Sequence, residues 1–180
     1  MNLFSKPNKY FFLALLGSFL LLTSCGFHLR GTVPLATPLQ HLYLQVADPY
    51  SSLTRNLRQS LASSGVQLVS SPAEADAVLI ILKENPSQQL LSVGSTQQTR
   101  QYNLILSVTF QINDARGKIL IPPQTVSESR SLTLQSNQIL GTSNEQDDLY
   151  QQMRQAVVYD IMNRLSSKEI TTLLNSEKAL

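Results

Sequence analysis

The strongest constraint on the fold is a stretch of twelve residues, 102–113, in which apolar and polar side chains alternate. Successive side chains of a strand point to opposite faces, so this period of two predicts one long strand with a single apolar face. Such a face must be covered by a second layer of structure. The predicted apolar set is Tyr102, Leu104, Leu106, Val108, Phe110 and Ile112.

The segments around this strand predict an antiparallel meander. Residues 77–82 are a continuous apolar run, typical of a strand covered on both faces, and residues 88–93 continue it beyond Pro86. Polar residues 94–99 have the composition of a hairpin tip, and residues 114–117 that of a turn. Because short turns join consecutive strands, we expect the strands to pair antiparallel.

The return strand, residues 125–134, has two irregular features. Pro122-Pro123 is expected to interrupt the chain before it. Glu128 and Arg130 fall on the same face as its apolar residues, which are Val126, Leu132 and Leu134. We therefore expect this strand to meet water or a partner there, with the two charges forming a same-face pair.

Two helices are predicted on either side of the meander. Asp48 is a candidate N-cap with Pro49 at the first helical position, and Gly65 follows the helix at the left-handed C-terminal position. The second helix is expected to begin at the Ser-x-x-Gln capping box of Ser143 and Gln146. Apolar stripes at helical spacing consist of Leu53, Leu57 and Leu61 in the first helix, and of Leu149, Met153, Ala156, Val157, Ile161 and Leu165 in the second.

The order of elements predicts an α+β fold. Short strands at 41–46 and 66–69 flank the first helix. We expect a two-layer sandwich: a mixed or antiparallel sheet of about four or five strands, with two helices packed on one face.

The N-terminus has the pattern of a bacterial lipoprotein signal. Lys6 and Lys9 precede an apolar run at 10–22, which is shorter than the ~20 residues that span a bilayer. The run ends in Leu22-Thr23-Ser24-Cys25, which resembles a lipobox, in which the Cys thiol accepts a diacylglyceryl group. A membrane helix with a chance Cys is the alternative. An N-acyl and S-diacylglycerol lipid on Cys25 would anchor the chain durably, and Gly26 after it favours the outer membrane.

The chain therefore divides into four parts. Residues 1–24 are the predicted signal peptide, and 25–38 a lipidated arm rich in Gly and Pro. Residues 39–168 form the predicted α+β domain, and 169–180 a C-terminal tail.

Charge excludes nucleic acid as a partner. Removing Lys6 and Lys9 from the 14 basic residues leaves 12, which match the 12 acidic residues. The mature chain is thus formally neutral, without the basic excess that binding to nucleic acid requires. Charged residues make up 14% of the chain, against about 25% in a typical protein. A surface rich in Gln, Ser, Thr and Asn would suit a protein largely covered by a partner.

Catalytic and metal-binding patterns are weak. His28 and His41 have no second ligand at metal-site spacing, so no metal or cofactor is expected. No Ser lies in a Gly-x-Ser-x-Gly context. Asp147 and Asp148 fit the first turn of the last helix, where carboxylates complement the helix dipole. We therefore predict that the protein is not an enzyme.

Basic residues of the hairpin region are candidate contacts for an anionic ligand. Several of them are expected to gather at one end of the sheet, where a phosphorylated lipid could bind. Solvated turn charges are the alternative. The residues are Arg100, Arg116, Lys118 and Arg130.

Two segments are distinctive beyond their local structure. The first is Cys25-Gly26-Phe27-His28-Leu29-Arg30-Gly31, directly after the lipobox. The second begins Asn144-Glu145-Gln146-Asp147 and continues through Tyr150, Met153, Arg154, Ala156, Val157 and Leu165. Both resemble the outer-membrane lipopolysaccharide-assembly lipoprotein family, LptE (also called RlpB).

The resemblance implies a partner, a location and a role. Proteins of this family sit inside the lumen of the LptD β-barrel as a plug, anchored by lipid on the periplasmic side of the outer membrane. The pair delivers lipopolysaccharide to the outer leaflet. The family places basic residues for cargo contact in the hairpin, where this chain has Arg100, and in the loop before the last helix, where it has none.

Two other functions are open from the residues alone. One is a lipid-anchored periplasmic chaperone or binding module for another envelope protein. The other is a small periplasmic enzyme, which would need two titratable groups converging in a pocket.

Overall fold

The computed structural model describes residues 35–94, 99–135 and 139–177. The predicted signal peptide, Cys25 and most of the arm lie outside the described residues. Short 3-10 turns lie at Thr37–Leu39 (η1) and Pro72–Glu74 (η2). The strands are β1 (His41–Gln45), β2 (Gln67–Leu68), β3 (Ala77–Val93), β4 (Thr99–Asn113) and β5 (Ile119–Gln135), and the helices are α2 (Ser52–Ser63), α3 (Ile139–Leu165) and α4 (Lys168–Glu177).

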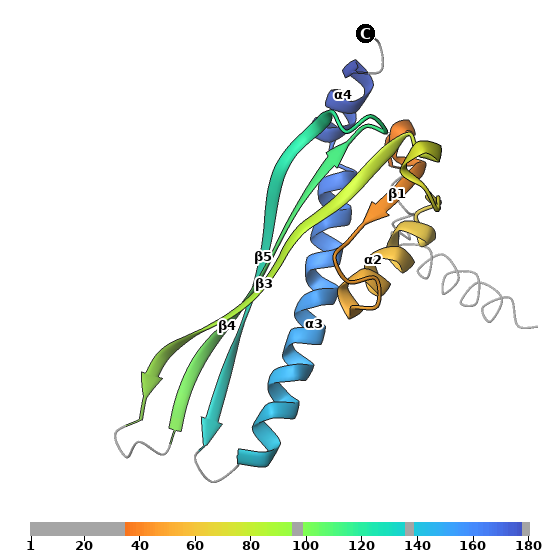
Figure 1. The fold of residues 1–180 in the computed structure, drawn as a ribbon. Helices are drawn as coiled ribbons and strands as arrows, with labels where there is room; N and C mark the ends of the chain where they lie inside the picture. The colour runs from red at the N-terminus through yellow and green to blue at the C-terminus, as the bar shows by residue number, and fades with distance from the viewer. Residues whose placement is uncertain (1–34, 95–98, 136–138, 178–180) are drawn as a thin grey trace, which may run out of the picture. The chain divides into compact units, whose positions relative to one another are not determined.

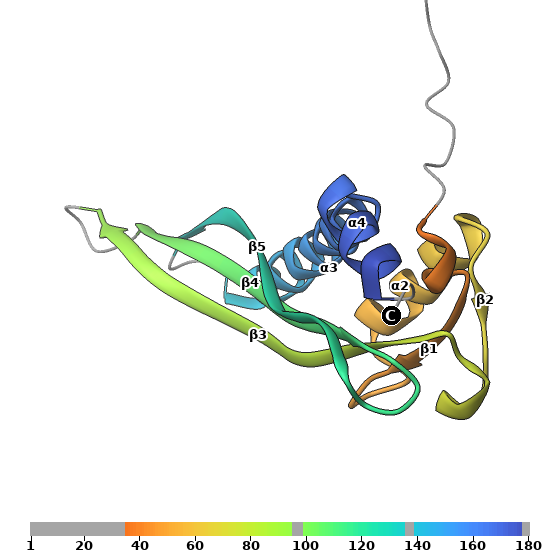
Figure 2. The ribbon, with the colours of Figure 1, turned by 90° about the horizontal axis from the view of Figure 1, so that it is seen from above.

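The predicted α+β sandwich is confirmed. The strands form one mixed sheet in the order β2-β1-β3-β4-β5, with β1 parallel to both neighbours and β3–β4–β5 an antiparallel meander. The helices cover one face of this sheet, and α3 runs along the long strands (Figures 1 and 2). The other face carries no helix in the described part of the chain.

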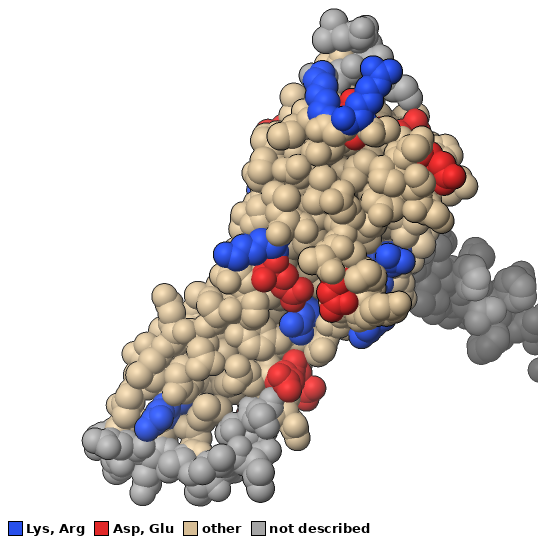
Figure 3. Space-filling view, in the orientation of Figure 1, with Lys and Arg blue, Asp and Glu red and all other residues tan. Residues whose placement is uncertain are grey.

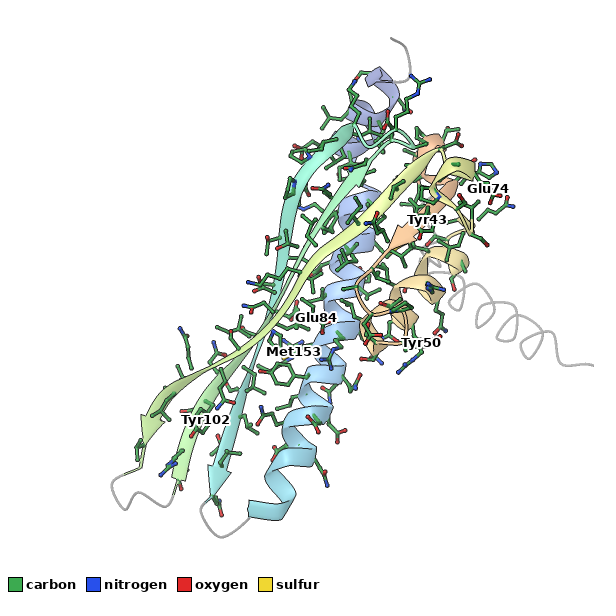
Figure 4. All side chains as sticks on the ribbon, viewed as in Figure 1. Tyr43, Tyr50, Glu74, Glu84, Tyr102 and Met153 are labelled. Carbon is green, nitrogen blue, oxygen red and sulfur yellow. The ribbon has the colours of Figure 1, made fainter. Side chains whose placement is uncertain are left out.

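Strand β4 forms as the alternation predicts. Leu104, Leu106, Val108, Phe110 and Ile112 are all 0% exposed, beneath the helices. The stripe of α3 packs against them, with Met153, Val157, Ile161 and Leu165 also at 0%. Figure 4 shows Met153 between α3 and the sheet.

The folded unit has two halves, which meet at the row formed by Lys83 of β3, Thr109 of β4 and Thr125 of β5. The wide half, residues 35–82, 110–124 and 155–177, contains β1, β2, α2, α4 and the end of α3. The narrow half, residues 83–93, 99–109, 125–135 and 139–154, consists of three strands and one helix.

Two helix starts differ from prediction. Helix α2 is capped by Ser51, whose Oγ accepts from the Thr54 N–H at 3.1 Å, and not by Asp48. Asp48 Oδ1 accepts instead from the Tyr50 N–H at 2.9 Å, so it closes a turn before the helix. Helix α3 begins at Ile139, so the predicted capping box at 143–146 lies inside it.

The predicted C-terminal tail is wrong, because residues 168–177 form α4. The Ser167 Oγ accepts from the Ile170 N–H at 3.3 Å and starts the helix. Ile170 and Leu174, one turn apart, are 1% and 2% exposed in the core. The end of the predicted arm also belongs to the domain, since Leu35, Ala36 and Pro38 are buried.

Both long edges of the sheet are irregular. Beyond Ile80, strand β3 has no partner on one side among the described residues, and it carries Pro86 and two register shifts. Edge strand β5 carries Pro122-Pro123 within a register shift between Phe110 and Ile112. The prolines therefore bulge the strand without ending it, contrary to the predicted interruption. Prolines and bulges hinder the addition of another strand to an edge.

Candidate functional site

The uncovered face of the meander is the candidate functional site. Strand registers place its side chains in five cross-strand rows, which we call the outer face. Thirteen of its fifteen residues are Ser, Thr, Asn or Gln. The rows are Lys83-Thr109-Thr125, Asn85-Ser107-Ser127, Ser87-Ile105-Ser129, Gln89-Asn103-Ser131 and Ser92-Gln101-Thr133.

Hydroxyl groups of the outer face bond to one another across strands. The Ser107 and Ser127 hydroxyls are 2.9 Å apart, and those of Thr109 and Thr125 are 2.8 Å apart. Cross-strand pairs of this kind each stabilise a sheet by roughly 0.2–1 kcal/mol. These pairs join four hydroxyls of the face, and the exposed polar groups around them can bind water or a partner.

Charge and apolar groups are almost absent from the outer face. Lys83 carries its only charge and Ile105 is its only apolar residue. In Figure 3 most of the visible surface over the strands is neither acidic nor basic, and charged side chains occur in small separate groups. This is the uncharged polar surface that the composition predicts.

Beneath the outer face, three polar contacts join α3 to the unpaired side of β3. The Arg154 Nε donates to the Glu84 Oε1 at 2.8 Å. The Tyr150 hydroxyl donates to the Ser87 carbonyl at 3.0 Å, and the Gln146 amide donates to the Gln88 side chain at 3.3 Å. Figure 4 shows Glu84 on the helix side of β3. The donors lie four residues apart, on one side of the helix.

Among the described residues, Tyr150 has a side-chain pKa that is clearly shifted from its ordinary value. Desolvation raises the pKa of its phenol above 10.0, and the nearby Arg154 charge offsets part of that rise. The phenol therefore stays protonated and can donate to the Ser87 carbonyl at neutral pH.

The predicted basic residues do not gather at one end of the sheet. Arg100 lies at the start of β4, whereas Arg116 and Lys118 belong to the turn at its other end. The strand between Arg100 and Asn113 is continuous, so the two ends are about 43 Å apart. That expectation is wrong because one unbroken strand separates the sites.

Three of these four residues, Arg130, Arg116 and Lys118, make local contacts. Arg130 pairs with Glu128 at 3.0 Å, which confirms the predicted same-face pair. The Asp114 Oδ1 accepts from the backbone N–H of Arg116 at 2.9 Å and of Lys118 at 2.8 Å, and so fixes the turn. Gly117, at φ 87°, supplies the left-handed residue that this turn requires.

Exposed apolar residues near the hairpin tip were not expected from the sequence. Leu90, Leu91 and Val93 are 55%, 54% and 47% exposed at the end of β3. The register shift between Leu90 and Ser92 turns consecutive residues outward, which alternation alone does not predict. These residues give the narrow half an apolar end.

Other kinds of site find no support among the residues described. No group of three His, Cys, Asp or Glu side chains there is placed to hold a metal ion. No helix within residues 35–94, 99–135 and 139–177 is long and apolar enough to cross a membrane.

Comparison by sequence identifies relatives along nearly the whole chain. Residues 39–165 match the family described as LptE, lipopolysaccharide-assembly. An LPS-assembly lipoprotein LptE of Pectobacterium atrosepticum is 30% identical over 171 residues, covering 92% of each chain. Its namesake in Yersinia enterocolitica is 31% identical, covering 91% of this chain and 79% of the relative.

Solved structures share the fold. A minor lipoprotein of Acinetobacter baumannii aligns with a TM-score of 0.60 and 28% identity, over 74% of this chain and 93% of that one. The rare lipoprotein B of Shewanella oneidensis aligns with a TM-score of 0.64 and 24% identity, over 73% and 98% respectively.

Proposed function

This chain belongs to the LptE lipopolysaccharide-assembly family, and from that premise we propose that it is the plug of an LptD-type β-barrel in the outer membrane. As a plug it assists the assembly of the barrel and the transport of lipopolysaccharide to the outer leaflet. The relatives are named LPS-assembly lipoproteins, which supports the transport role.

The observation that carries the plug proposal is the outer face. The lumen of a large membrane barrel is polar and water-filled, so a domain inside it needs a surface that is polar but not densely charged. Thirteen uncharged polar side chains in five rows meet that need. The irregular edges of β3 and β5 support the proposal too, because they hinder the barrel's strands from extending the sheet.

The lipid anchor fits this location. A diacylglyceryl thioether and an N-acyl chain on Cys25 would hold the chain at the periplasmic side of the outer membrane. Residues 26–34 would then link the lipid to Leu35, the first residue that the structure describes, which is buried.

Cargo contact is assigned to the narrow end in this proposal. Arg100 is exposed there, near the exposed apolar residues Leu90, Leu91 and Val93. A cation beside apolar groups suits a phosphorylated lipid. Arg130, which is paired with Glu128, is a secondary candidate in the same half. Arg116 and Lys118 lie in the turn at the opposite end of β4, so any contact with cargo there would be a separate one. None of these roles requires a catalytic group or a cofactor.

The test is photo-crosslinking in the native host. A photo-reactive amino acid replaces Ser129, in the middle of the outer face, and after irradiation the tagged chain is purified from the outer membrane. We expect a crosslinked product that contains a large β-barrel of the LptD type. The same substitution at Met153, a residue of α3 that is 0% exposed against the sheet, is the matched control. It should give no intermolecular product.

Each result separates the proposal from its rivals. A barrel that co-purifies but never crosslinks from Ser129 would mean that another surface meets it. Recovery of a different envelope protein would favour the alternative, a lipid-anchored periplasmic chaperone or binding module. Unchanged barrel levels and unchanged surface lipopolysaccharide after depletion of the chain would refute the proposed role.

A further inference from the structure

A groove lies between α2 and α3 in the wide half, away from the outer face. It encloses about 470 Å³, within the range of about 300–1,000 Å³ typical of small-molecule sites. Helix α2 lines one wall with Asn56, Gln59, Ser60, Ser63 and Ser64, and α3 lines the other with Gln155, Val158, Tyr159 and Met162.

The groove has no charged residue in its lining. Six of its nine side chains are Ser, Asn or Gln, which both donate and accept hydrogen bonds. Within the described part of the chain, no hydrogen bond engages the side chains of Asn56, Gln59 or Gln155. These three amides are therefore available to a bound molecule.

Apolar groups complete the lining. Val158 is 2% exposed and forms part of the base with the half-buried Met162. Tyr159, the next residue along α3, also lines the groove and is 60% exposed, so part of its side chain is accessible to a ligand. An exposed aromatic ring beside unpaired amides forms an amphipathic site. The face of a ligand can pack on the ring while polar groups at the ligand's edge bond to the amides.

We propose that this groove binds an uncharged oligosaccharide. A pyranose ring has C–H groups on its faces, which pack on an aromatic ring, and hydroxyls around its rim, which pair with amides and serine hydroxyls. The absence of Lys and Arg from the lining disfavours a phosphate or carboxylate, which would need a countercharge when desolvated.

Two sources provide this chemistry: N-acetylated glycan strands of a cell wall, and neutral sugar chains carried by a lipid. The probes are therefore N-acetylchitohexaose for the first and the delipidated neutral polysaccharide of the native host for the second. Binding is measured by saturation-transfer NMR on the full chain, in a detergent whose headgroup is not a sugar. We expect saturation transfer to one of the two probes.

Matched tyrosine variants locate the binding. Tyr159→Ala should weaken binding by about two- to tenfold, the effect of losing one aromatic contact. Tyr50→Ala removes a ring that is 84% exposed outside the groove and should leave binding unchanged. The pair Asn56→Ala and Gln155→Ala tests the amides independently, and circular dichroism confirms that each variant folds.

Saturation transfer to neither probe would overturn the proposal. So would equal binding by the wild type, the Tyr159→Ala variant and the Asn56→Ala/Gln155→Ala variant. Because the assay uses the isolated chain, its outcome does not depend on whether a barrel is the partner.

Discussion

The two halves of the folded unit obtain their stability in different ways. In the wide half, α2, α3, α4 and η1 enclose a core whose members Leu57, Leu79 and Phe110 are 0% exposed. In the narrow half, α3 covers a smaller core that includes Leu104 and Met153, and Arg154 and Tyr150 add polar contacts to β3. The wide half therefore has the larger apolar core, whereas the narrow half leaves polar and apolar surface for a partner.

The largest effect is expected in the wide half. Phe110→Ala removes a large side chain that is 0% exposed and should lower the free energy of unfolding by about 3–5 kcal/mol. Chemical denaturation measures the change, and protection of backbone amides from hydrogen exchange should fall throughout both halves. A loss below about 1 kcal/mol would mean that the wide half is not the main source of stability.

A smaller and more local effect is expected in the narrow half. Leu104 is also 0% exposed, but one helix covers it, so the site can collapse more easily around a deletion. Leu104→Ala should cost about 2–3 kcal/mol, and hydrogen exchange should accelerate mainly in residues 139–154 and in the hairpin strands. Equal acceleration in α2 would show that the halves unfold as one unit.

The ion pair between Arg154 and Glu84 tests the polar contacts. Arg154→Met should reduce the free energy of unfolding by about 1 kcal/mol, because the pair is partly buried at side-chain exposures of 21% and 24%. A double-mutant cycle with Glu84→Gln isolates the pairwise energy. A coupling energy indistinguishable from zero would leave α3 held by apolar packing alone.

The smallest effect concerns pH. The pKa of Tyr150 is raised in the folded chain, mainly by desolvation, so the unfolded chain loses this proton first as pH rises above 10.0. The stability that Tyr150 contributes is thus complete below that pH and is lost as pH rises through the raised pKa. The measurement is the tyrosinate absorbance of the wild type minus that of Tyr150→Phe, which isolates the titration of Tyr150. This difference should rise at a higher pH in the native chain than in denaturant.

The sequence predicted those elements whose signal is local. The alternation at 102–113 and the stripe of α3 identify the buried faces correctly, because burial sets the period of apolar residues directly. Helix starts were less predictable. Asp48 and Ser143 both have cap chemistry, and only the folded backbone decides whether each is used. For α4, Ser167 with Ile170 and Leu174 was an available signal, although a short one.

The candidate site was predictable in composition but not in position. A low charge content indicated an uncharged surface, yet the five rows follow from strand register, which the sequence alone does not specify. The gathering of Arg100 and Arg116 at one end was predicted wrongly for a different reason. The long strand predicted at 102–113 already separates the two residues, so the sequence itself was enough to place them at opposite ends.

Because the outer face carries almost no charge, the salt concentration of the solution should have little effect on a partner that binds there. Salt weakens interactions between exposed charges, and at physiological ionic strength it largely screens those separated by more than about 8 Å. Hydrogen bonds between hydroxyls and amides carry no net charge and are largely unaffected. Lys83 is the only outer-face group that such screening reaches. An interface built on this face would therefore hold with nearly the same strength in dilute and in concentrated salt.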